Sequence, residues 1–269
     1  TDDIISSDSI TKDFKGLNKV LKPTSNFTNA MHKVAGSIQR NMIKIQKREA
    51  LKATMVTNIL FAILGIVFGI SYFMTVKFEM NYTEVLLRMG AYYKPLIVEF
   101  NQYWRLITPM FLHGDFIHLF MNTLAMRNLG TILEKELGPL RYLMTILSGV
   151  LFGSVFLFIK NDPAIGVGIS SGIYALLGVL LVYLFEKNLY KNRMILMNIT
   201  TTILLNLYIS LMPNVSMTAH LGGLYVGVIL GFIFSKRKDW DQIRKFAQLI
   251  LVTSIAFLGM LMIQNINIL

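Results

Sequence analysis

The sequence contains no cysteine among its 269 residues. Disulfide bridges, thiolate metal sites and cysteine nucleophiles are therefore excluded. Charge is also scarce, because only 15% of the residues are charged while 54% are hydrophobic and the mean hydropathy is +0.55. Soluble domains carry about a quarter charged residues. The composition thus excludes an ordinary soluble protein.

The apolar residues are concentrated in long stretches without charge. The longest runs from residue 194 to residue 235, and the last 24 residues carry no charge at all. Because a helix needs about 20 apolar residues to cross a bilayer, we predict an all-α, polytopic membrane protein. Seven spans are expected, at about 54–76, 114–133, 140–159, 169–186, 194–212, 216–235 and 246–265.

The segment before the first span is polar and then amphipathic. Residues 1–29 are predicted to form a loosely ordered tail, and Met31 to Lys52 a basic amphipathic helix at a membrane surface. The first residue is Thr1 and no apolar signal segment follows, so we expect a trimmed N-terminus without a signal peptide. The expected domains are residues 1–53 (tail and helix), 54–235 (six-span core) and 236–269 (basic turn and seventh span).

Positive charge alternates between the two sides of the predicted spans. Counted from residue 33 onward, the side that includes residues 33–52 carries 17 Lys and Arg residues, and the other side carries five. By the positive-inside rule the N-terminus is expected in the cytoplasm and the C-terminus outside. The net charge of +11 therefore indicates contact with anionic lipid, and no nucleic-acid partner is expected.

Several polar residues lie within or beside these spans, where polar groups are expensive and are functional candidates. The predicted topology brings all of them to the external ends of three helices, at similar depth. A serine in a span more often bonds its own helix backbone, and a histidine near the interface is commonly structural. A metal site is disfavoured because no carboxylate within a span would complete it. The residues are His113, His118, Asn122, Ser170, Ser171 and His220.

The sequence Gly168-Ile169-Ser170-Ser171-Gly172 fits the G-x-S-x-G pattern of α/β-hydrolases. That pattern requires a preceding strand, whereas a short polar turn precedes it here, so we reject a hydrolase fold. A serine at the start of a helix is retained as a hypothesis, because the free N–H groups there could stabilise an oxyanion.

Taken together, these motifs resemble the rhomboid intramembrane serine proteases, over about residues 54–235. Each motif is weak alone, but their order and spacing are specific. They are Tyr103-Trp104-Arg105; His113, His118 and Asn122; Leu129-Gly130, Glu134 and Leu137-Gly138; Gly168-Ile169-Ser170 with Gly172-Ile173-Tyr174-Ala175-Leu176-Leu177-Gly178; and Ala219-His220-Leu221-Gly222-Gly223 with Gly227 and Gly231. The resemblance implies a six-helix bundle, here with one extra C-terminal span.

The resemblance implies a catalytic dyad of Ser170 as nucleophile and His220 as general base. The family usually has Gly directly after the nucleophile, whereas this chain has Ser171. Counting back from Tyr174 assigns Ser170 to the nucleophile position. The departure raises the question of how closely the fourth span packs beside the helix that carries His220.

The resemblance also implies supporting roles for further residues. His118 and Asn122 would stabilise the oxyanion, Tyr174 would pack against the base, and His113 would hold the external loop. Glycines 222 and 223 narrow the sixth span and allow close helix contact. The other supporting positions of the family motifs are Trp104, Arg105, Glu134 and Gly168. No cofactor or metal is expected, and the expected partners are transmembrane protein substrates and membrane lipids.

Two other functions compete with the protease. A catalytically silent relative would bind transmembrane segments as a chaperone or retention factor, and only Ser171 favours it. A transporter or channel would be expected to show internal repeats or charges deep within the spans, and we find neither. A bacterial cell membrane is the expected location, with an organelle as the alternative.

Overall fold

The computed structural model describes residues 25–161, 165–210 and 215–267. Within these ranges the regular structure is helical, apart from one isolated bridge, which confirms the predicted all-α class. The chain divides into two units between Lys52 and Ala53. In the first unit the structure describes helix α2 (Ser25–Ala53), which begins before the predicted Met31. The predicted tail over residues 1–24 lies outside the described residues.

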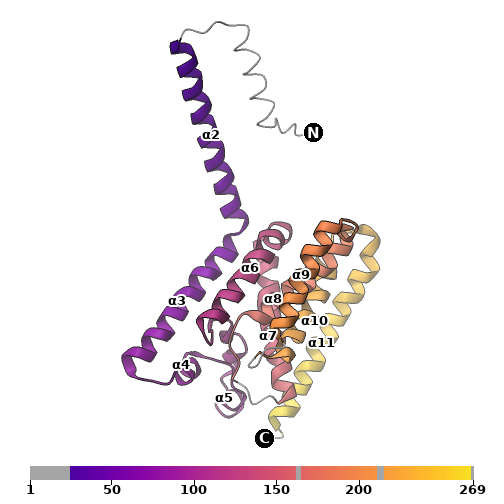
Figure 1. Cartoon of the computed structure of the whole chain (residues 1–269). Coiled ribbons are helices and arrows are strands. Elements are labelled where there is room, and N and C mark those ends of the chain that lie inside the picture. The colour runs from indigo at the N-terminus through magenta and orange to yellow at the C-terminus, as the bar shows by residue number, and fades with distance from the viewer. Residues whose placement is uncertain (1–24, 162–164, 211–214, 268–269) are drawn as a thin grey trace. The chain divides into compact units, whose positions relative to one another are not determined.

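In the second unit a long helix lies at each of the seven predicted spans (Figure 1). Among the described helices, α3, α7, α10 and α11 are long and apolar enough to cross a membrane. Helix α8 and the described part of α9 are shorter apolar helices, and Arg127 interrupts the apolar sequence of α6. The helices are α3 (Met55–Phe78), α6 (Phe116–Leu137), α7 (Pro139–Lys160), α8 (Ser170–Glu186), α9 (Arg193–Ser210), α10 (Met217–Phe234) and α11 (Asp241–Asn267).

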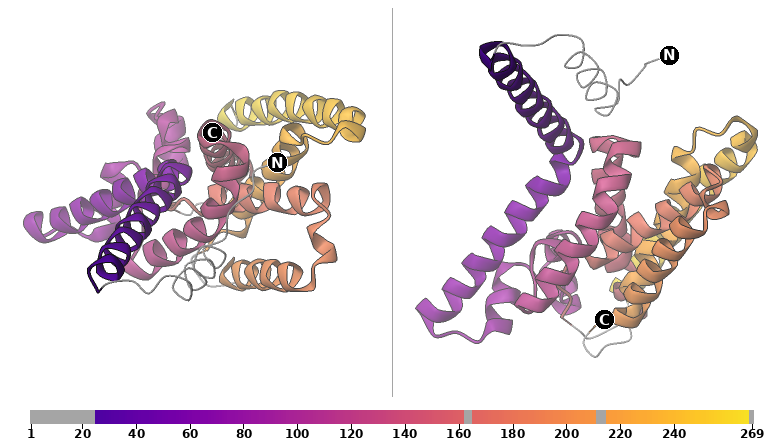
Figure 2. Two further views of the ribbon diagram at one scale, coloured as in Figure 1. Left: turned by 90° about the horizontal axis from the view of Figure 1, so that it is seen from above. Right: turned by 45° about the horizontal axis from the view of Figure 1, so that its top comes forward.

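Helix α8 is the centre of this unit. Twelve of its 17 residues are buried, and it packs against α6, α7 and α10. Helix α11 lies on the outside, against α10 and α7 (Figure 2). The hydroxyl oxygens of Tyr225 in α10 and Ser254 in α11 are 2.5 Å apart. A helix that is apolar on all sides is stable only inside a bundle or a membrane. The buried α8 therefore gives its first residues fixed surroundings.

The connection between α3 and α6 is folded into short helices. These are α4 (Tyr82–Met89), α5 (Lys94–Glu99), η1 (Tyr103–Leu106) and η2 (Thr108–Phe111). Its apolar side chains form a small cluster with the end of α7, which includes Tyr92, Ile97 and Phe158. The connection thus packs onto the bundle. Residues 79–115 are called the external connection below, because the predicted topology places them outside; that side stays a prediction.

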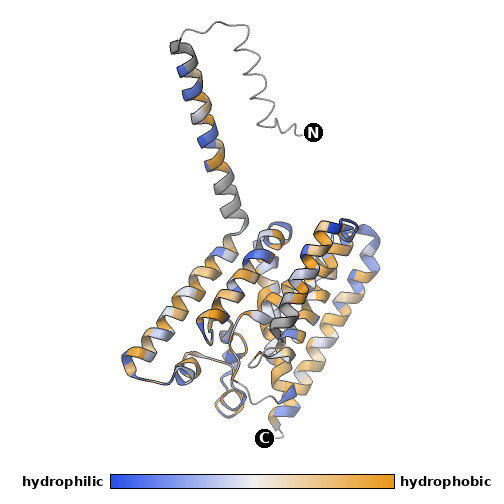
Figure 3. Cartoon of the chain, in the orientation of Figure 1, coloured by the Kyte–Doolittle hydropathy of each residue, from blue (hydrophilic) through white to orange (hydrophobic). Residues whose placement is uncertain are grey.

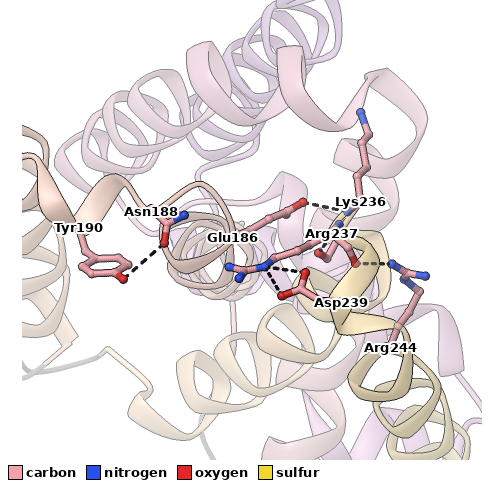
Figure 4. Close-up of polar contacts among 8 residues, drawn as sticks. Glu186, Asn188, Tyr190, Lys236, Arg237, Asp239 and Arg244 are labelled. Atoms are coloured by element: carbon pink, nitrogen blue, oxygen red, sulfur yellow. Dashed lines mark hydrogen bonds and ion pairs between the residues drawn. The ribbon is translucent and has the colours of Figure 1, made fainter.

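Polar contacts join α8 and α10 at the end away from Ser170 (Figure 4). Glu186 Oε1 accepts a hydrogen bond from the Lys236 backbone N–H at 2.9 Å. Arg237 donates to both carboxylate oxygens of Asp239, and Arg244 donates to the Arg237 carbonyl. The turn after α10 is therefore tied both to the last turn of α8 and to the start of α11.

Candidate active site

Ser170 is the first residue of α8, and the loop before it is held by the backbone of the external connection. Tyr92 and Gly166 exchange two backbone hydrogen bonds, of 2.9 and 3.0 Å. The Gly168 N–H donates to the Pro109 carbonyl at 2.8 Å. Gly168 has φ +109°, a conformation that suits glycine. These contacts fix the direction from which the chain enters α8.

His220 lies in the first turn of α10 and reaches Ser170. Its Nε2 is 2.8 Å from Ser170 Oγ, and the His220 side chain is buried. Ser216 caps the helix by accepting the Ala219 N–H at 3.3 Å. The ring of Tyr174, one turn after Ser170, stacks on the His220 ring with centroids 4.2 Å apart. A hydroxyl, an imidazole and an orienting aromatic ring thus meet at one point.

Close contact between α8 and α10 makes this distance possible. At Gly223, an added Cβ would overlap the backbone of Ser171, and at Gly222 it would lie 2.8 Å from the Phe152 carbonyl oxygen of α7. Since real Cβ atoms do not approach so closely, both positions need a residue without a side chain. The small residues bring the first turns of α8 and α10 together.

Ser171 does not separate these two helices. Its backbone contacts Gly223 of α10, whereas its side chain lies beside Gly153 of α7. A Cβ added at Gly153 would lie 2.6 Å from Ser171 Cβ and 2.9 Å from Ser171 Oγ. The hydroxymethyl group of Ser171 is therefore accommodated by a glycine on the neighbouring helix.

His118 and Asn122 lie on one face of α6 and approach the loop before Ser170. A Cβ added at Gly168 would be 2.8 Å from His118 Nε2 and 3.5 Å from Asn122 Nδ2. The Asn122 side chain is buried, and its Nδ2 has no hydrogen-bond acceptor among the described residues. The amide N–H groups of Asn122 are therefore available to an incoming oxygen.

His113 is buried just before α6. Its ring meets the His118 ring edge to face, with centroids 5.1 Å apart. Burial, together with the charge of His118, lowers the pKa of His113 to about 3, although the carboxylate of Asp115 opposes this shift. The His113 carbonyl accepts the Tyr82 hydroxyl at 2.8 Å. A neutral His113 can pack against His118 without a buried charge; its predicted role in holding the external loop stays a prediction.

Trp104 and Arg105 lie in η1 and shape the external connection. The guanidinium of Arg105 is buried, and its Nη1 donates to the carbonyls of Leu87 and Ala91 at 2.8 Å each. It also lies 4.5 Å from the centre of the Trp104 ring, which is about half exposed. Arg105 therefore holds the turn that leads into Tyr92.

Glu134 lies at the other end of α6 from His118. Its buried carboxylate accepts the N–H groups of Val56 and Thr57, at 2.6 and 3.0 Å, and the Thr57 hydroxyl at 2.7 Å. The hydroxyl oxygens of Thr57 and Tyr142 are 3.0 Å apart. The first N–H groups of a helix need outside acceptors. Glu134 thus caps α3 from a neighbouring helix.

Lys94 joins the seventh long helix to the external connection. Its buried ammonium donates to Asn161 Oδ1 at 2.8 Å and to Asn265 Oδ1 at 3.4 Å, and lies 4.7 Å from the centre of the Phe158 ring. Lys94 follows Tyr92 by two residues. The end of α11 is therefore attached to the segment that holds the loop before Ser170.

The sequence reasoning passed over several positioning residues. Asp115 accepts the His118 N–H at 2.8 Å and caps α6. Asp115 and Ser216 are capping residue types three residues before their bonded N–H groups, so a search for helix caps would have found both. The contacts of Pro109, Tyr92 and Gly166 use backbone atoms only. The residue types at these three positions therefore do not predict these contacts.

Among the described residues no group of three His, Asp or Glu side chains could hold a metal ion. His118 and His113 face each other, while His220 faces Ser170. The arrangement is suited to acyl transfer, because it pairs a hydroxyl with an imidazole and places N–H donors nearby.

Comparison with known proteins places the site within a recognised domain. The family model for the Rhomboid domain matches residues 100–237. RHOMBOID-like protein 6, mitochondrial, of Arabidopsis thaliana is 34% identical over 174 residues, which are 62% of this chain and 55% of that protein. Rhomboid protease GluP of Bacillus subtilis is 35% identical over 146 residues, or 54% of this chain and 28% of GluP. The YdcA protein of the same bacterium is 33% identical over 52% of this chain and 71% of its own length. The chain thus spans about half the length of the plant relative and less of GluP.

Proposed function

Because this chain belongs to the rhomboid family, we propose that it is an intramembrane serine endopeptidase acting through a Ser170–His220 dyad. The observation that carries the proposal is the 2.8 Å distance between Ser170 Oγ and His220 Nε2. A serine hydroxyl is a weak nucleophile and needs an adjacent base. The relative GluP is named as a rhomboid protease.

In the acylation step, Ser170 Oγ attacks the carbonyl carbon of the scissile peptide bond while His220 Nε2 takes the hydroxyl proton. The Oγ–C bond forms and the carbonyl oxygen becomes an oxyanion. The Asn122 amide, the His118 ring and the Ser170 backbone N–H are the donors assigned to it, because they surround the start of α8. When the C–N bond breaks, His220 gives its proton to the leaving amine.

In the second step, water hydrolyses the acyl-enzyme. His220 takes a proton from the water, whose oxygen attacks the ester carbon, and the proton returns to Ser170 Oγ as the ester bond breaks. No carboxylate is needed in this scheme as a third member. Instead, the stacked Tyr174 ring, 4.2 Å away, orients His220.

The substrates proposed are other membrane proteins, cut in or next to a transmembrane segment. Ser170 opens one apolar helix and His220 lies in the first turn of a second, so both lie near the ends of membrane-embedded helices. A helical segment keeps its carbonyls bonded internally. Small or helix-breaking residues near the cut would therefore free the scissile bond.

For the orientation in the membrane we propose a cytoplasmic N-terminus and an active site that opens to the external side. The support is the distribution of Lys and Arg, which from residue 33 onward is 17 on the inner side against five on the outer side. A bacterial cell membrane is the proposed location. An organelle membrane is the alternative location, because a relative named as mitochondrial is also similar to this chain.

The proposal is tested by reconstituting the purified protein in vesicles with a tagged single-span substrate. Cleavage is expected for a substrate with a helix-breaking residue near its outer end and should fall when that residue is replaced by Leu. Ser170→Ala should abolish cleavage, while the neighbouring Ser171→Ala serves as the matched control and should retain it. Binding of the substrate without cleavage by the wild type would instead support a silent binding protein. Cleavage of soluble peptides alone would contradict the substrate class.

A further inference from the structure

We propose that helix α2 is a membrane-surface helix that binds a bilayer containing anionic phospholipid. The described side chains from Met31 to Ile45 support an interfacial helix. Val34, Ile38 and Ile45 are each more than half exposed, although they are branched apolar residues. A row of exposed apolar side chains on a helix indicates a partner surface.

The apolar residues form one narrow stripe. At about 100° per residue, five of the Met, Val and Ile side chains from Met31 to Ile45 fall within an arc of about 80°, and Ile43 lies outside it. Figure 3 shows hydrophobic and hydrophilic residues alternating along the described part of α2. Met31 and Met42 are 11 residues apart, as are Val34 and Ile45. Such a repeat runs nearly straight along a helix and suits a flat surface. The five residues, called the apolar stripe below, are Met31, Val34, Ile38, Met42 and Ile45.

The opposite side of the helix is basic. Lys33, Arg40 and Lys44 are exposed and lie about 140° from the centre of the apolar stripe. The sequence of α2 contains six Lys or Arg residues and a single acidic residue, Glu49. An apolar stripe with a strongly basic polar face is the pattern of helices that lie in the interface of anionic membranes.

A second copy of the helix fits this pattern less well. A coiled-coil seam started at Met31 and Val34 would continue through Ile38 to Asn41, and then through Ile45 to Arg48. A seam needs apolar residues at these alternating positions. Polar residues would therefore occupy two of its places, and the basic faces of two copies would repel each other. Anionic lipid satisfies both the stripe and the charge.

The chain itself keeps α2 close to a bilayer. Only Thr54 separates the last residue of α2 from Met55, the first residue of the apolar α3. A short connection gives the helix a high effective concentration at the membrane surface. Weak contacts of the five side chains of the apolar stripe and a few basic residues with lipid are then sufficient to hold α2 on the bilayer.

The test is site-directed spin labelling of the full chain in nanodiscs that hold one copy each. Because the sequence has no cysteine, a single introduced cysteine is the only labelling site. Ile38→Cys reports the apolar stripe, and Asn29→Cys reports the opposite face about 180° away. In discs with anionic phosphatidylglycerol, the label at position 38 should be immersed in the bilayer, so it should collide more often with oxygen, which dissolves in lipid, than with a water-soluble nickel chelate. The label at position 29 should lie in water.

Charge is tested by replacing three lysine or arginine residues with glutamine. Lys33→Gln, Arg40→Gln and Lys44→Gln together should lower the ratio of immersed to released helix by about fivefold per charge, roughly 100-fold in all. The matched control is the exposed trio Lys191→Gln, Lys236→Gln and Lys238→Gln, which removes the same charge elsewhere and should leave the immersion unchanged. A thermal melt verifies that both variants are folded.

Three results would overturn the proposal. One is a water-exposed label at position 38 in anionic discs of the wild type. Another is a label at position 38 that is immersed to the same extent in neutral and anionic discs and whose immersion is unchanged by the three glutamine substitutions. The last is a dipolar broadening of the spectrum of the label at position 38 in vesicles that disappears on dilution with unlabelled protein. Such broadening would show that the apolar stripe contacts a second copy of the chain. None of these readouts depends on proteolysis, so they are independent of the proposed catalytic function.

Discussion

The ring of Tyr174 is stacked on the ring of His220, with centroids 4.2 Å apart and planes inclined by 12°. This contact spans the two helices that carry the proposed nucleophile and base. A triad uses a carboxylate to fix the imidazole. In the proposed dyad the Tyr174 ring would have this orienting role instead, and the shape of the ring should matter more than its hydroxyl group.

Replacement of Tyr174 should therefore affect catalysis through the position of His220. Tyr174→Leu should lower kcat by about tenfold, a part of the 10²–10⁴-fold that acid–base catalysis supplies, because the imidazole loses its stacking face. Tyr174→Phe should retain more activity than Tyr174→Leu. The measurement is cleavage of the single-span substrate at saturating concentration. Equal losses in both variants would show that stacking is not the reason.

The contact at Gly223 should be sensitive to a single methyl group. Gly223→Ala would force a Cβ into the Ser171 backbone, so it should destabilise the protein by about 1–3 kcal/mol and lower activity by moving α10 from α8. Gly69→Ala in α3 is the control, since an added Cβ meets no atom within 4 Å there. Thermal unfolding in detergent measures both. Similar melting temperatures for the two variants would contradict the close contact.

The pairing of Ser171 with Gly153 can be tested by a double-mutant cycle. Gly153→Ala alone should destabilise the protein, because its Cβ would meet Ser171 Cβ, Ser171 Oγ and the Ala219 carbonyl oxygen. Ser171→Gly should restore part of the loss, with a coupling of about 0.5–3 kcal/mol. The remaining loss is due to Ala219, which the second substitution leaves in place. Strictly additive effects would mean that Ser171 faces another neighbour.

Glu134 should contribute to stability through the start of α3. Glu134→Ala would leave the Val56 and Thr57 N–H groups without their acceptor, and charged hydrogen bonds of this kind contribute about 1.5–3 kcal/mol each. A loss of about 3 kcal/mol or more is expected in unfolding experiments. Glu99→Gln, at an exposed position of the external connection, is the control and should change little.

Lys94 should give stability a recognisable dependence on pH. Burial lowers the pKa of Lys94 from the ordinary 10.5. At a pH between the lowered pKa and 10.5, Lys94 therefore binds more protons in the unfolded chain than in the folded one. The wild type should therefore gain stability relative to Lys94→Met as pH rises toward 10.5. Melting curves between about pH 8 and pH 11 measure this difference. Lys160→Met, at an exposed position, should show no such trend.

Much of this architecture could be predicted from the sequence because membrane helices follow simple rules. Uncharged runs indicated six of the seven long helices, whereas Asp115 and Arg127 interrupt the span predicted at 114–133, where α6 lies. The spacing of His118 and Asn122 on one helix face, and of Ser170 and Tyr174 on another, also follows from helix geometry. The structure brings these residues together with His220.

The contacts that depend on three dimensions could not be predicted. The place of the Ser171 side chain beside Gly153 depends on how α7 and α8 are rotated, which no periodicity specifies. The Tyr92–Gly166 bridge is a backbone contact between distant segments. The junction of Lys94 with Asn265 joins residues 171 positions apart, and neither residue type indicates a partner.

Labelling with a fluorophosphonate probe tests the central claim most directly, because the probe reacts only with an activated serine. Purified wild type should be labelled, Ser171→Ala should be labelled to a similar extent, and Ser170→Ala and His220→Ala should not be labelled. A thermal melt of each variant provides the folding control. Loss of labelling only in Ser171→Ala, or no labelling of a folded wild type, would contradict the proposed Ser170–His220 dyad.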